Sequence, residues 1–98
     1  MAQADPKAQQ ALAIVLFLSS GTPSSERARS AVNTAMANAG LPDSVLEIVD
    51  VRVDPQRAMR EGAIVVPIVS VTAGNEHRWY AGGFEDLSHL DALFRGLA

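Results

Sequence analysis

The sequence contains no cysteine. Disulfide bonds, thiol catalysis and thiolate metal sites are therefore excluded for this chain, although the cellular compartment stays open. Basic residues are in the minority, because 8 Lys and Arg stand against 11 Asp and Glu and the formal net charge is −3. This balance gives no electrostatic basis for binding nucleic acid or an anionic membrane surface.

The chain also lacks an apolar run long enough to cross a membrane. Its first apolar run is ALAIVLFL, residues 11–18, whereas a spanning helix needs about 20 residues. The run has the length of a signal-peptide core, but Asp5 offsets Lys7 and no small-residue cleavage pattern follows. A buried strand is the better interpretation, and we expect a cytoplasmic protein.

The composition, 48% hydrophobic and 19% charged, is typical of a globular domain. A chain of 98 residues is long enough for one core. Residues 1–10 are polar, as frayed termini usually are. We expect a flexible tail over residues 1–10 and a single domain over residues 11–98.

Two segments begin with the same helix-start signal, a capping residue followed by proline. Thr22-Pro23 opens a segment that ends at Gly40, and Asp54-Pro55 opens a shorter one over residues 55–61. A third helix is expected after Ser88, which can serve as its cap. The first helix carries an apolar stripe at helical spacing, formed by Ala28, Ala31, Val32, Ala35, Met36 and Ala39.

Four segments are expected to be strands: residues 11–18, 45–51, 64–72 and 77–81. The third is interrupted by Pro67, which a central strand should not contain. Residues 73–76 are a hairpin turn signal that joins the last two strands. The order β-α-β-α-β-β-α predicts an α/β fold of the thioredoxin-like type, with a four-stranded mixed sheet and helices on both faces.

The residues at the helix starts resemble the KaiB family of circadian-clock proteins, which are thioredoxin-like but lack redox cysteines. The resemblance covers residues 12–72 and rests on LFLSSGTPSSERA, LEIVDVRVDPQRA and the later proline. After Val69 the chain departs from the family, since the usual proline-rich basic stretch is absent, and Val66 stands where the family has threonine. The matching positions are Thr22, Pro23, Ser25, Arg27, Ala28, Asp50, Val51, Pro55, Gln56, Ala58 and Pro67.

The resemblance implies a protein-binding function without catalysis and without a cofactor. Proteins of the KaiB type dock on the ATPase ring of KaiC, and a related domain of a clock histidine kinase docks on the same ring. Some members also adopt a second, tetrameric fold. Residues 64–72 are rich in β-branched side chains, so we expect the thioredoxin-like form to dominate here; two sets of amide resonances would contradict this.

The resemblance places the partner contacts at the first helix corner, around the second helix and at the strand edge near it. Ser24 and Ser25 in that corner admit two interpretations, an anion site or ordinary helix capping, and capping is favoured. Neither serine has an apparent base, so neither is a convincing nucleophile. The predicted partner-binding residues are Thr22, Pro23, Ser25, Arg52, Gln56, Arg57, Arg60 and Pro67.

Other residues carry weaker signals. The thioredoxin-like fold implies a cis peptide bond before Pro67, facing the helix corner. His77 and His89 have no metal-ligand spacing, so no metal site is expected. Trp79 and Tyr80 should point to opposite faces of a strand, one packing against the last helix and the other facing outward, and a core role for Trp79 is equally open.

Two alternative functions stay open. A thioredoxin-like enzyme relative would bind an anionic thiol cofactor at the corner beside Pro67. A self-associating accessory domain, dimeric or tetrameric, would have no other partner. The leading interpretation is a binding module for a KaiC-like ATPase or a signalling histidine kinase.

Overall fold

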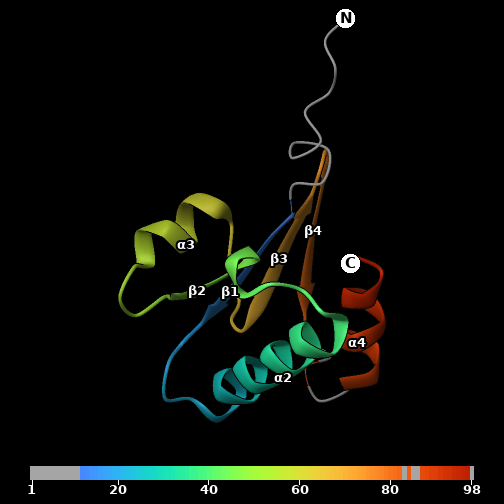
Figure 1. The fold of residues 1–98 in the computed structure, drawn as a ribbon. Helices are drawn as coiled ribbons and strands as arrows, with labels where there is room; N and C mark the ends of the chain where they lie inside the picture. Colours follow the sequence, from blue (N-terminus) through green and yellow to red (C-terminus); the bar gives the residue numbers. More distant parts are fainter. Residues whose placement is uncertain (1–11, 83, 85–86, 98) are drawn as a thin grey trace, which may run out of the picture.

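The computed structural model describes residues 12–82, 84 and 87–97. The expected tail, residues 1–10, lies outside the described residues. A central sheet separates α2 and α4 on one face from α3 on the other (Figure 1). The elements in chain order are β1 (Leu12–Leu18), α2 (Pro23–Ala39), the short 3₁₀ helix η1 (Asp43–Val45), β2 (Leu46–Asp50), α3 (Pro55–Glu61), β3 (Ile68–Ala73), β4 (Glu76–Ala81) and α4 (Leu87–Arg95).

The sheet has four strands in the order β2-β1-β3-β4. β1 pairs with β2 in parallel and with β3 antiparallel, so Leu16 of β1 lies between Ile48 of β2 and Val69 of β3. β3 and β4 form the antiparallel hairpin. The predicted fold class is confirmed: the sheet is mixed, the helices cover both faces, and β1, which is apolar throughout, is the strand buried on both sides.

Both predicted helix-start signals are confirmed. Thr22 caps α2, its side chain accepting a hydrogen bond from the Ser25 N–H, and Pro23 is the first helical residue. Asp54 caps α3 in the same way, accepting from the Arg57 N–H at 3.1 Å. Gly40 ends α2 with φ 70°, a left-handed conformation that costs glycine little.

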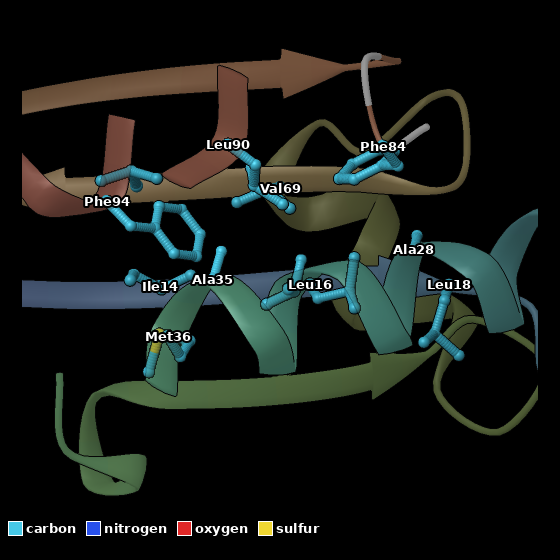
Figure 2. Packing of buried hydrophobic residues seen from close by; sticks show 12 residues of the cluster. Ile14, Leu16, Leu18, Ala28, Ala35, Met36, Val69, Phe84, Leu90 and Phe94 are labelled. Carbon is cyan, nitrogen blue, oxygen red and sulfur yellow. The ribbon is translucent and has the colours of Figure 1, made fainter. Parts of the chain in front are cut away.

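The main core lies between the sheet and the pair α2 and α4 (Figure 2). Leu16 and Val69 of the sheet meet Ala35 of α2 and Phe94 of α4 in this layer. The small alanines on the buried side of α2 allow the helix to pack close to the sheet. A smaller core on the other face holds Val15, Phe17, Val49, Ala58 and Ile68 beneath α3.

Two predictions about element boundaries were wrong. β3 begins at Ile68 and not at Ile64, because Pro67 has no N–H to contribute to the ladder. α4 begins at Leu87, so Ser88 lies inside its first turn and is not the cap. The residues before Pro67 instead form a connection to α3 in which Ile64 and Val65 are exposed to solvent.

The expectation for the two adjacent aromatic residues was half right. Tyr80 packs against the main core, which includes α4 residues. Trp79 does not face outward freely, because it packs against the smaller core, with its ring centroid 5.9 Å from that of Phe17. Within the described residues, no helix is long and apolar enough to cross a membrane.

Candidate functional site

The corner between β1 and α2 is closed by its own hydrogen bonds. The Ser25 hydroxyl accepts from the Ser19 N–H at 2.9 Å, and the Thr22 hydroxyl donates to the Ser19 carbonyl at 2.9 Å. The Gly21 N–H donates to the Glu26 carboxylate at 3.1 Å. Side chains of the corner thus occupy donors that an anion would otherwise use, as the capping interpretation requires.

Ser25 does not belong to a contact surface. It is only 1% exposed, so its hydroxyl serves the loop and cannot reach a partner. This corrects the prediction that Ser25 is a partner-binding residue. Pro23 and Ser24 are exposed and Thr22 is half-buried, so the accessible part of the corner is limited to these neighbours.

Asp50 connects the end of β2 to the same corner. Its carboxylate accepts from the Ser20 N–H at 3.4 Å and from the Arg52 N–H at 3.0 Å, and the Arg52 guanidinium donates to the Ser20 carbonyl at 3.1 Å. A hydrogen bond from Ser20 and a second from the Arg52 backbone hold the pKa of Asp50 below its ordinary value. These bonds fix the ends of the two parallel strands relative to each other.

Arg57 links α3 to β2. Its guanidinium makes two hydrogen bonds to the Glu47 carboxylate, at 2.7 and 2.8 Å, and a further one to Glu61. The hydrogen bond from Arg57 lowers the pKa of Glu47. The charge of Arg57 is therefore paired within the chain, whereas the Arg60 side chain makes no ion pair or hydrogen bond with other described residues.

Stability is expected to fall with acidification because the pKa of Glu47 is lower in the folded chain than its ordinary value of 4.5. The stabilisation is present above that value and is lost as the pH falls through the lower folded value. Since the pair is largely exposed, its contribution should be about 0.2–1 kcal/mol. Urea midpoints at pH 7 and pH 3 should differ less for Glu47→Gln than for the wild type; parallel pH profiles would contradict this assignment.

Exposed apolar side chains surround α3. Ile64 is 90% exposed, Val53 80% and Met59 79%, and Val65 is also exposed. Gln56, Met59 and Arg60 are exposed at helical spacing, so they share one face of α3. We call the following set the α3 surface: Arg52, Val53, Gln56, Met59, Arg60, Ile64 and Val65.

The sequence reasoning identified only the polar members of the α3 surface. Met59 could have been noticed, because it follows Gln56 by three residues on the same helical face. Ile64 and Val65 carried a misleading signal, since β-branched residues beside a β-rich run predict a strand. Whether one of these apolar residues is exposed or in the core depends on which parts of the fold cover it. No local sequence pattern shows this.

The peptide bond between Val66 and Pro67 is cis, as expected. Pro67 is half-buried and lines a small open groove of about 250 Å³ together with Ser24 and Arg27 at the start of α2. The structure therefore brings the corner and Pro67 together. The groove is smaller than the usual small-molecule site, which has about 300–1,000 Å³.

No group of three metal-binding side chains occurs among the described residues. His77 is exposed and its Nε2 lies 2.7 Å from the Ser70 hydroxyl, while His89 lies on α4. The two histidines are thus engaged in separate places on the molecule.

No family model and no curated protein matches this sequence. Solved structures do match it across nearly its whole length. The fold is thioredoxin-like. The thioredoxin Deadhead of Drosophila melanogaster is similar over 93% of this chain and 85% of its own, with TM-score 0.67 and 17% identity.

Two further structures agree. Oxidised thioredoxin from Plasmodium falciparum matches over 93% of this chain and 86% of its own, with TM-score 0.67 and 18% identity. The N-terminal domain of Synechococcus elongatus SasA matches over 99% of this chain and 87% of its own, with TM-score 0.64 and 19% identity. At these identities the likeness establishes the thioredoxin-like fold.

Proposed function

We propose that this chain is a non-catalytic, cytoplasmic binding module of the KaiB type that regulates a KaiC-like ATPase or a signalling histidine kinase by docking on it. The observation that carries the proposal is the α3 surface, where Ile64 and Met59 are 90% and 79% exposed. Large apolar side chains gathered on a surface and rimmed by polar residues are typical of protein interfaces. The sequence resemblance to KaiB covers α3 and its cap.

The charges around the α3 surface favour a partner with carboxylates at its rim. Arg60 has no ion pair with described residues, and Arg52 and Gln56 are also exposed. An interface with an apolar centre and a polar rim would pair these groups with acidic side chains of the partner. Arg57 links α3 to β2 through Glu47.

The helix corner supports binding and not catalysis. The sequence has no cysteine, and the hydroxyls of Thr22 and Ser25 are used in capping and loop hydrogen bonds. The likeness in fold to the SasA N-terminal domain is compatible with the proposal. Thr22 and Pro23 of the corner, and Pro67 in the groove, extend the proposed contact region.

The test is a pull-down from native lysate with the tagged chain, in ATP and in ADP. The wild type should recover a KaiC-like ATPase or a histidine kinase. Ile64→Asp should reduce recovery at least about tenfold, because it places a charge in the apolar centre of the interface. Asn33→Asp, which adds the same charge on an exposed position of α2, is the matched control and should bind normally.

Recovery of neither protein, or equal recovery by Ile64→Asp and the wild type, would refute docking through the α3 surface. Arg27 beside the Pro67 groove favours one alternative, a small anionic ligand such as a thiol tripeptide. Calorimetric binding of that tripeptide, abolished by Arg27→Ala, would support the alternative.

A further inference from the structure

β4 is an open edge of the sheet. Among the described residues its one neighbouring strand is β3, and Glu76, His77 and Arg78 are exposed along it. An open edge presents backbone donors and acceptors that another strand can pair with. The chain thus has a free edge on the side away from β2.

The hairpin turn decides which backbone groups of β4 face this edge. Ala73 pairs with Glu76 across a two-residue turn, and Gly74 in it has φ 59°. Residues that flank such a turn bond to each other, and bonding then alternates along the strand. The N–H and C=O groups of His77 and Trp79 therefore point away from β3.

A groove follows the same edge between β4 and α4. It consists of two hollows of about 260 and 340 Å³ that share Tyr80 and Leu93. α4 sits on this face of the sheet, with Leu90 close to Val69 of β3 (Figure 2). Ala92 and Leu97 add apolar lining, so the groove leaves apolar surface beside the open edge.

We propose that the β4 edge binds β4 of a second copy of this chain, antiparallel, around a two-fold axis at His77. Opposed residues of an antiparallel pair point to the same face, and in this register Glu76 of each copy lies opposite Arg78 of the other. Opposite charges in that position are stabilising and like charges are destabilising. A register centred on Arg78 would instead oppose two arginines.

The same two-fold axis covers the groove. An axis perpendicular to the sheet keeps both α4 helices on one side, so the grooves lined by Leu93 and Leu97 of the two copies lie on the same face of the joined sheet. Strand pairing alone buries little surface area. The apolar side chains that line the groove add to the buried area that a stable interface requires. One symmetric contact thus uses the free edge, the groove, and the charges of Glu76 and Arg78, which lie 3.8 Å apart within one chain.

The interface is separate from the proposed docking surface. β2 forms the other edge of the sheet, and α3 lies on that side of the molecule (Figure 1). A dimer through β4 would therefore leave both α3 surfaces exposed. The inference does not rest on the proposed function.

The test is sedimentation velocity from about 1 μM to about 1 mM protein, a range that detects weak dimers. The wild type should show concentration-dependent dimerisation. Glu76→Arg and Arg78→Glu should each raise the dimer dissociation constant at least about tenfold. Each variant places like charges opposite each other, and the two-fold axis makes this repulsion occur twice in the dimer. The double variant should return to within about threefold of the wild type, because it restores both pairs.

Arg60→Glu is the matched control, since it makes the same charge change as Arg78→Glu on the α3 side. It should leave dimerisation unchanged and weaken capture of the partner protein. Arg78→Glu should weaken dimerisation and leave capture of the partner protein unchanged. Circular dichroism checks that each variant is folded. A wild type that stays monomeric, single variants that dimerise normally, or a double variant as weak as the single ones overturns the proposal.

Discussion

Phe94→Ala is expected to lower the free energy of unfolding by about 3–5 kcal/mol. Phe94 is 0% exposed and joins α4 to the main core, where it lies near Ala35 and Ile14 (Figure 2). Truncation leaves a cavity that the packed layer can only partly refill. A domain of this size has about 5–15 kcal/mol of stability in total, so the loss should be severe. Urea unfolding followed by circular dichroism measures it.

Leu87→Ala is the control for this prediction. Leu87 lies on the same helix but is 37% exposed, so its truncation should cost no more than about 1 kcal/mol. A loss in Leu87→Ala as large as that in Phe94→Ala would contradict the assignment to core packing, because alanine has the higher helix propensity at both positions.

Ser25→Ala is expected to destabilise the chain by about 1–3 kcal/mol. The change removes the oxygen that accepts from the Ser19 N–H at 2.9 Å, and Ser25 is 1% exposed, so water cannot readily replace that oxygen. The N–H would be left without a partner at the point where β1 turns into α2. Chemical denaturation at neutral pH measures the loss.

Ser24→Ala tests the same chemistry one residue earlier. Ser24 is exposed and its hydroxyl makes no hydrogen bond with described residues, so its change should stay within about 0.5 kcal/mol. Equal effects at the two serines would show that the corner depends on helix-start propensity and not on the buried hydroxyl.

Features with local causes were predictable. The caps at Thr22 and Asp54 were correct because a capping side chain reaches only two or three residues along the chain. The turn before β4 was correct because Gly74 supplies the positive φ it needs. The parallel pairing of β1 with β2 was correct because a helix joins these two strands.

Features that depend on distant residues were not predictable in the same way. The serines of the corner looked alike in sequence, yet only Ser25 is buried, because the loop closes over it through Ser19. Arg57 looked like a free cation until folding placed Glu47, ten residues earlier, against it. The sequence did not decide on which face of the sheet Trp79 lies. In the structure, β4 places its ring against that of Phe17.

The sequence by itself determined the starts of α2 and α3, the order of elements and the absence of thiol chemistry, because each depends on residue type and near neighbours. Only the tertiary structure decided which apolar side chains stay in solvent. Met59 and Ile64 are as apolar as Ala58 and Ile68, and their exposure follows from the direction in which α3 and its loop meet the sheet. Burial is a property of the assembled fold, and the α3 surface exists for that reason.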